Sequence, residues 1–199
     1  KTLIVANDEG SYYELDMDGN ILHRTKLGNY DLEGVVCEEK EIFFAIENKG
    51  ILKVQRKRVK KEKLKLDPNY EGKDLPLFNK KAGVEGIAKQ GNIVYISKQS
   101  NKKKNSFIAV LEMVSDHLKV IDVIEHHIPD TSGLTIHDGY LYMVSDKKDL
   151  LIKYDLQKKK IVEKVKLAKG SWEGIAFDDK GFLYLADDDG RVLKYKKKS

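Results

Sequence analysis

The chain has 199 residues, of which 41% are hydrophobic and 35% are charged, and its 37 Lys and Arg against 32 Asp and Glu give a formal charge of +5. A chain of this length buries roughly 70% of the surface of its unfolded state, so we expect a single domain over residues 1–199. No apolar run approaches the roughly 20 residues of a membrane helix, which excludes a transmembrane helix, and the lone Cys37 excludes an internal disulfide.

The excess of positive charge does not point to nucleic acid. Lysine supplies most of it, and the arginines are Arg24, Arg56, Arg58 and Arg191. Arginine forks are the usual means of contacting bases and phosphates, and no zinc, helix-turn-helix or RNA-binding pattern accompanies the lysines. We therefore expect no nucleic-acid partner, with the lysine runs on solvated turns and strand edges.

Short apolar and polar alternations rich in Tyr, Val and Ile follow one another along the chain, as half-buried strands require. The first three lie at 2–8, 11–17 and 20–27. Sets of four then follow at 32–36, 42–48, 51–57 and 64–66, at 84–88, 93–99, 106–113 and 118–125, and at 132–136, 141–147, 151–156 and 161–167. The last three lie at 172–176, 183–189 and 191–197. Each set of four predicts a four-stranded antiparallel meander, and the first and last sets predict three strands of such a meander.

The meanders recur about every 40 residues, which is the period of a β-propeller blade. Longer intervals reflect two insertions, one at Asp67 to Gly83 and one around Lys102 to Lys104. The pattern predicts an all-β propeller with five blades, in which the first blade lacks its first strand. That strand would lie upstream of Lys1, or the terminal blade would close by pairing the two chain ends. A six-bladed ring in a longer parent protein is the alternative.

Polar residues mark two places in each blade that should meet at one end of the ring. In an antiparallel meander the start of the first strand lies beside the end of the second, and in propellers the first strand lines the central channel. The first strands begin with Glu33, Glu85, Ser132 and Glu173, and the second strands end with Asn7, Glu47, Lys98, Asp146 and Asp187. Trp172 would line a ligand pocket there or pack between blades.

Six carboxylates and one ammonium at a single opening predict either a bound cation or an internally neutralised polar ring. Two charges about 5 Å apart repel by about 3 kcal/mol at an effective dielectric constant of about 20. Oxygen ligands without His or Cys suit calcium before magnesium. In the other interpretation Lys98 is itself the resident cation, and the glutamates bond to neighbouring blades.

The sequences around the four first-strand starts carry a family resemblance. Asp31-Leu32-Glu33-Gly34-Val35 and its counterparts at 83–87, 130–134 and 171–175 resemble the SdiA-regulated (YjiK-like) bacterial family. The resemblance implies a cell-envelope propeller of poorly defined role, whose first inner strand would precede this chain. The pattern is also similar to calcium-activated nucleotidases, which implies Glu33, Glu85, Ser132 and Glu173 as metal ligands. Lys98 and the lack of a phosphate-gripping basic cluster depart from those enzymes.

Two functions follow as expectations. The first is an extracytoplasmic binding module, in the envelope or secreted, with calcium at the channel mouth and a small-molecule or protein ligand contacting Glu47, Lys98, Asp146, Asp187 and Trp172. The second is a calcium-dependent hydrolase, either a phosphohydrolase of apyrase or phytase type or a lactonase. In the enzyme Lys98 would stabilise developing negative charge, and Asp146 or Asp187 would act as general base. We expect a monomer in either case, and an upstream segment removed before Lys1.

Overall fold

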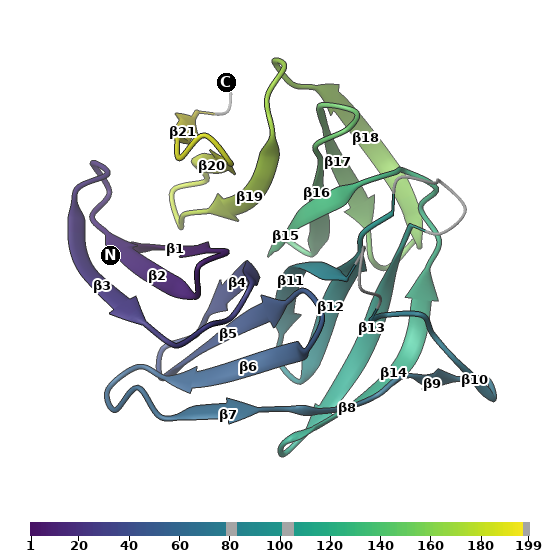
Figure 1. Ribbon diagram of the computed structural model, residues 1–199. Coiled ribbons are helices and arrows are strands. Elements are labelled where there is room, and N and C mark those ends of the chain that lie inside the picture. Colours follow the sequence, from purple (N-terminus) through teal and green to yellow (C-terminus); the bar gives the residue numbers. More distant parts are fainter. Residues whose placement is uncertain (79–82, 101–105, 197–199) are drawn as a thin grey trace.

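The computed structural model describes residues 1–78, 83–100 and 106–196, and every regular element among them is a β-strand. Five sheets of mainly antiparallel strands surround a common centre and radiate outward, and a sixth sheet is a separate two-stranded hairpin (Figure 1). The predicted five-bladed propeller is therefore confirmed. Among the described residues there is accordingly no helix that is long and apolar enough to cross a membrane.

The blades follow one another in chain order. Blade 1 contains β1 (Leu3–Asn7), β2 (Ser11–Leu15) and β3 (Ile21–Lys26). Blade 2 contains β4 (Leu32–Cys37), β5 (Glu41–Ile46), β6 (Gly50–Gln55) and β7 (Lys61–Lys63). Blade 3 contains β11 (Val84–Gln90), β12 (Ile93–Lys98), β13 (Phe107–Val114), β14 (His117–Ile124) and the added strand β8 (Lys65–Asp67). Blade 4 contains β15 (Thr131–His137), β16 (Tyr140–Ser145), β17 (Leu150–Asp155) and β18 (Lys160–Lys166). Blade 5 contains β19 (Trp172–Phe177), β20 (Leu183–Asp187) and β21 (Val192–Tyr195).

The segment predicted as one outer strand at 64–66 is divided between two blades, which corrects the prediction of four strands in every unit. The amide of Leu64 donates to the carbonyl of Ile51 in blade 2 at 2.9 Å, whereas the amide of Lys65 donates to that of Asp116 in blade 3 at 2.8 Å. β8 then pairs in parallel with β14. The chain therefore links blades 2 and 3 along their outer edges.

The two predicted insertions are described only in part. The first contains a small hairpin of β9 (Asn69–Tyr70) and β10 (Lys73–Asp74). Its residues 79–82 lie outside the described residues, and so does the second insertion at Lys102 to Lys104.

Apolar side chains from the faces of neighbouring blades form the core. Phe43 of blade 2 packs with Val94 and Leu111 of blade 3, and Leu134 and Met143 of blade 4 pack with residues of blade 3. The inner strands β4, β11, β15 and β19 lie next to one another around the centre. Stacking of sheet on sheet thus holds the inner strands at fixed positions around the channel.

Blade 1 and blade 5 meet differently. In the described part of the chain β1 pairs with β2 alone and β21 with β20 alone, so the terminal strands do not pair with each other. An ion pair between Lys1 and Asp179 joins the two blades across this junction. The expected closure by pairing of the chain ends is therefore wrong within these residues.

Candidate functional site

The inner strands turn their polar residues toward the channel through four matching irregularities. The pairing register shifts between Leu32 and Val35 in β4, and equivalent shifts lie at 84–87, 131–134 and 172–174. Glu33, Glu85, Ser132 and Glu173 lie within these bulges. A β-bulge redirects a side chain relative to its strand, so the recurrent Glu-Gly or Ser-Gly step is the sequence that forms the bulge.

The glutamates and several aspartates surround a cavity of about 1020 Å³ at the centre of the ring. We call the six carboxyl groups that gather at its polar end the acidic mouth, and these are Asp31, Glu33, Glu47, Glu85, Glu173 and Asp188. Asp187 also lines this cavity, whereas Ser132, Lys98, Asp146 and Trp172 are not among the described lining residues. The structure thus brings together the predicted glutamates.

Carboxyl groups of the acidic mouth are hydrogen-bonded in three pairs. Glu85 pairs with Glu33, Glu47 with Asp31, and Glu173 with Asp188. A hydrogen bond between two carboxyl groups requires one proton, because an ionised carboxylate only accepts. Glu85 and Glu173 supply that proton in their pairs, since burial raises the pKa of both.

Burial is the main cause of the raised pKa values in the mouth, and neighbouring negative charges add to it. Burial, with the charges of Glu33 and Glu173, raises the pKa of Glu85 to about 9. Burial also raises the pKa of Glu33 to about 7, with Asp31 and Glu47 contributing. Burial and the bond to Asp188 raise the pKa of Glu173 to about 8. At neutral pH Glu85 and Glu173 are the proton donors of their pairs.

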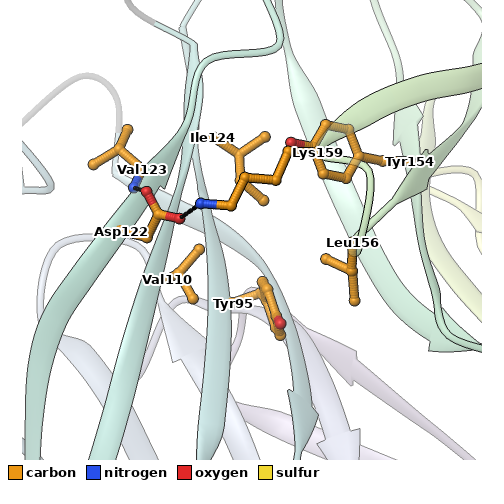
Figure 2. A pocket seen from close by; sticks show the side chains of 8 residues that line it. All are labelled: Tyr95, Val110, Asp122, Val123, Ile124, Tyr154, Leu156 and Lys159. Atoms are coloured by element: carbon orange, nitrogen blue, oxygen red, sulfur yellow. Dashed lines mark hydrogen bonds and ion pairs between the residues drawn. The ribbon is translucent and has the colours of Figure 1, made fainter.

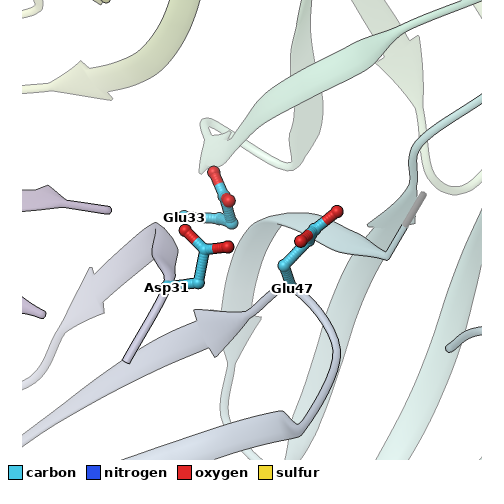
Figure 3. Close-up of side chains that lie close together, drawn as sticks. All are labelled: Asp31, Glu33 and Glu47. Atoms are coloured by element: carbon cyan, nitrogen blue, oxygen red, sulfur yellow. The ribbon is translucent and has the colours of Figure 1, made fainter. Parts of the chain in front are cut away.

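Asp31, Glu33 and Glu47 form the tightest group, and one carboxylate oxygen from each lies within 4.8 Å of the other two. Figure 3 shows the carboxyl groups of Asp31 and Glu33 next to each other, with the Glu47 side chain beside them. The backbone holds two of them together, because the amide of Glu47 donates to the carbonyl of Asp31 at 3.3 Å. These three residues are the best-placed donors for a metal ion among the described residues.

The sequence analysis did not select Asp31 or Asp188 as site residues. Asp31 precedes the first inner strand by one residue, and its counterparts in the other three copies are Gly83, Asp130 and Ser171, so an acid does not recur at this position in every copy. Asp188 directly follows Asp187, and the pairing register of β19 and β20 determines which of the two side chains meets Glu173. The signal that would have found both is acidity in the residue adjoining each bulge or strand end.

The predicted alignment of the second-strand ends is one residue out of register in two of the five copies, at Glu47 and at Asp146. The strand ladders place Asn7, Ile46, Lys98, Ser145 and Asp187 in one position, and Asp8, Glu47, Gln99, Asp146 and Asp188 in the next. Side chains alternate along a strand, so these two sets point differently. Asn7 and Asp187 each accept from an amide four residues on, Ser11 at 2.9 Å and Arg191 at 3.1 Å. Asp187 is further held by Arg191 Nε at 2.8 Å, which makes it a hairpin cap.

The remaining predicted residues have identifiable neighbours. Lys98 is only 5% exposed; burial lowers its pKa, and the negative charges of Glu85 and Glu47 oppose that shift. The Ser132 hydroxyl donates to the carbonyl of Trp172 at 2.6 Å, which ties blade 4 to blade 5. Trp172 is 2% exposed and packs with Val144. Burial also raises the pKa of Asp146. Ligand contact by these residues stays a prediction.

A second, smaller cavity of about 230 Å³ lies between blades 3 and 4 (Figure 2). Lys159 reaches across it to Asp122 with a distance of 2.6 Å between Nζ and Oδ2. Tyr95 and Tyr154 form part of its wall, and burial raises the pKa of both phenols. Asp122 and Lys159 line this space and pair with each other, which favours a role in joining the blades.

Residues 1–191 match the SdiA-regulated protein family, a span that ends just before β21, the last strand of blade 5. The chain belongs to the SdiA-regulated family. The resemblance inferred from the Glu-Gly repeats is thereby confirmed. No curated protein matches the chain.

Solved structures similar to this member of the SdiA-regulated family share its fold at low sequence identity. Glutaminyl cyclase from Myxococcus xanthus is 11% identical with a TM-score of 0.67, and the match covers 94% of this chain and 83% of that one. BamB from Moraxella catarrhalis is 12% identical with a TM-score of 0.53, and here 99% of this chain covers 55% of the other. A protein of unknown function from Bacteroides caccae is 15% identical with a TM-score of 0.59, covering 100% and 69%. Identities this low support the fold alone.

Proposed function

We propose that this protein is a binding module that holds a divalent cation, calcium before magnesium, in the acidic mouth and presents a ligand surface around it. The observation that carries the proposal is the convergence of three hydrogen-bonded carboxyl pairs on one cavity. Such groups repel one another when ionised, so a cation that replaces the shared protons would relieve the repulsion.

The spacing of the donors suits calcium. Calcium–oxygen distances of about 2.3–2.6 Å let two ligand oxygens on one ion lie up to about 5 Å apart. The oxygens of Asp31, Glu33 and Glu47 fall within 4.8 Å of one another, so one ion fits among them. Magnesium demands shorter distances and a near-octahedral shell, which these three side chains meet less readily.

Proton release gives the proposal its most direct test. Calcium titrated calorimetrically at pH 7 in two buffers of different ionisation enthalpy should give different apparent enthalpies, because Glu85 and Glu173 must lose protons. Glu47→Gln should weaken calcium binding at least about tenfold, since it removes a charged ligand. Glu163→Gln, on the exposed face of β18, is the matched control and should leave binding unchanged.

Absence of saturable calcium or magnesium binding at pH 8 would contradict the proposal. It would favour the internally neutralised ring, with Lys98 interacting electrostatically with Glu85 and Glu47 as its resident cation. The Glu47→Gln variant should then keep its melting temperature in both calcium and chelator.

The hydrolase alternative is favoured by one feature, a buried lysine beside the acids, as a charge-stabilising group would require. Nucleoside diphosphates, phytate and lactones should be assayed in calcium and in chelator. We expect no turnover. Turnover that requires calcium and is lost in Lys98→Met would contradict the binding module and support the calcium-dependent hydrolase.

An extracytoplasmic location is part of the same proposal. Extracellular calcium modules bind the ion with a Kd of about 10⁻⁴–10⁻³ M, so they fill only where calcium is abundant, and we place this site among them. Fractionation of cells that carry the full-length protein should place it in the envelope or the medium. Recovery in the cytosol would contradict this location.

A further inference from the structure

Strand β14 changes the faces of its side chains partway along its length. Val120 lies in the core between blades 2 and 3, and the pairing register with β13 then shifts, with Ile121 as the extra residue of a β-bulge. Beyond the bulge Val123 packs against that same core, whereas Ile124 lies in the core between blades 3 and 4. Because side chains alternate along a strand, the bulge turns Asp122 toward blade 4 together with Ile124.

Asp122 thereby lines the smaller cavity, of about 230 Å³, between blades 3 and 4 (Figure 2). Its Oδ1 atom accepts from the amide of Val123 at 2.8 Å, which fixes the carboxylate, and its Oδ2 atom accepts from Lys159 Nζ at 2.6 Å. Lys159 is the more movable partner, because it lies on the turn between β17 and β18 and its side chain is 70% exposed. The Lys159 ammonium therefore marks the position at which an ammonium group binds Asp122.

Two tyrosine side chains in the wall of this cavity offer further polar contacts. Tyr95 of β12 is 8% exposed and Tyr154 of β17 is 7% exposed, and both line the cavity. In the part of the chain that the structure describes, neither phenol oxygen makes a hydrogen bond. A buried tyrosine usually gives its hydroxyl group a partner. The ion pair that joins the blades does not supply one, whereas a ligand with hydrogen-bond acceptors would.

We propose that this cavity binds a small apolar α-amino acid, whose ammonium group replaces Lys159 Nζ on Asp122 and whose carboxylate accepts from Lys159 and the tyrosine hydroxyl groups. Such a zwitterion exchanges the resident ion pair for two new ones, so no charge is left without a partner. Val110, Ile124 and Leu156 form the apolar wall for its side chain. The cavity is smaller than the roughly 300–1,000 Å³ of sites for drug-sized ligands, which suits a single amino acid.

This site is separate from the acidic mouth. The two cavities share none of their lining residues, so the inference goes beyond the proposed cation site and does not depend on it. Its test is carried out in chelator. Failure of amino-acid binding therefore leaves the metal proposal standing, and failure of calcium binding leaves this inference standing.

Calorimetric titration of the full chain with leucine at pH 7 is the test. We expect saturable binding, and at least about tenfold weaker binding of 4-methylpentanoate, which lacks the ammonium group, and of leucinamide, which lacks the carboxylate. Asp122→Asn should weaken leucine binding at least about tenfold, and Tyr154→Phe, which removes only the hydroxyl group, by about twofold to tenfold. Asp116→Asn is the matched control, since this carboxylate pairs with Lys65 elsewhere on blade 3, and it should leave leucine binding unchanged.

Replacement of Lys159 gives a readout that a purely structural ion pair would not. Lys159→Met removes the resident ammonium group, so leucinamide should bind more tightly to this variant than to the original chain, because no lysine then competes for Asp122. Leucine should gain less from the same substitution, because its carboxylate loses the lysine as a partner.

Three results would overturn the inference. The first is no saturable binding of leucine, isoleucine or methionine by the folded chain. The second is equal binding of leucine by Asp122→Asn and the original chain, with circular dichroism showing that both are folded. The third is leucinamide binding as tight as that of leucine, since the cavity would then recognise a simple amine and not an amino acid.

Discussion

The inner strands β11 and β19 carry nearly the same sequence, VEGIA at 84–88 and WEGIA at 172–176, yet they differ in burial. In β11 the first five residues are all buried, whereas in β19 only Trp172 is. β11 has inner strands on both sides, β4 and β15, while β19 has β15 on one side and the open junction with blade 1 on the other. The number of neighbouring blades, and not the strand's own residues, therefore sets how much surface each repeat buries.

This difference predicts unequal energetics for equivalent positions. Stability in repeat architectures depends on interfaces between neighbouring units as much as on the units themselves. Substitutions in β11 act on two interfaces, and the same substitutions in β19 act on one. Paired variants at matching positions measure this directly.

The largest contrast should come from the glycines. Gly86→Ala places a methyl group against the carbonyl of Ser132 and should cost about 3 kcal/mol or more, because backbone on both sides resists movement. Gly174→Ala meets only the Ala186 side chain of its own blade, so about 1 kcal/mol is expected. Urea denaturation of both variants gives the two losses. Equal losses would mean that the inter-blade approach at Gly86 is not rigid.

A second contrast concerns the isoleucines that follow these glycines. Ile87 is 1% exposed in the core between blades 2 and 3, so Ile87→Ala should cost about 3 kcal/mol. Ile175 is half-buried beside the open junction, and Ile175→Ala should cost about 1 kcal/mol. The same denaturation experiment applies.

The repeat made the fold predictable from sequence, because the period and the strand patterns specify a blade and a blade cannot bury its faces alone. Finer features depended on contacts that no local pattern records. The division of 64–66 between blades 2 and 3 depends on where Leu64 and Lys65 find carbonyl partners. The shift of Glu47 relative to Lys98 depends on bulges, which change the count of residues on one strand only.

The sequence predicted the acidic chemistry of the candidate site better than it predicted which residues form the site. Glu33, Glu85 and Glu173 were identified because each begins a repeated inner strand. Asp31 and Asp188 required knowledge of which carboxyl groups face each other. The carboxyl groups to which they are hydrogen-bonded, those of Glu47 and Glu173, lie on other strands. The periodicity of a single strand therefore cannot predict these pairs.

The pH dependence of stability should also differ between Glu85 on β11 and Glu173 on β19. The folded protein keeps the Glu85 proton up to about pH 9, whereas an unfolded glutamate releases it near 4.5. The unfolded state is therefore favoured as pH rises, and the melting temperature in chelator should fall between about pH 5 and pH 9. Glu85→Gln should flatten this decline more than Glu173→Gln, since Glu85 is 7% exposed and Glu173 is only half-buried.

Added calcium is the control for the fall of the melting temperature with rising pH. At pH 9 Glu33 and Glu173 are mostly ionised and Glu85 is at its pKa of about 9, so added calcium should restore the melting temperature of the original chain and act less on Glu85→Gln. A melting temperature that rises from pH 5 to pH 9 in chelator would contradict the assigned burial of these groups.

The smallest effects should come from the ion pairs at the blade junctions. Lys159 and Asp122 join blades 3 and 4 at the closed side, and Lys1 and Asp179 join blades 1 and 5 across the open side. Exposed ion pairs contribute little because solvent screens the charges and ordering two long side chains costs entropy. Asp179→Asn should leave the melting temperature unchanged, and Asp122→Asn should lower it only slightly, since Asp122 is the more buried of the two carboxylates. If Asp179→Asn were instead the more damaging variant, the ion pair between Lys1 and Asp179 would be a main contact between blades 1 and 5.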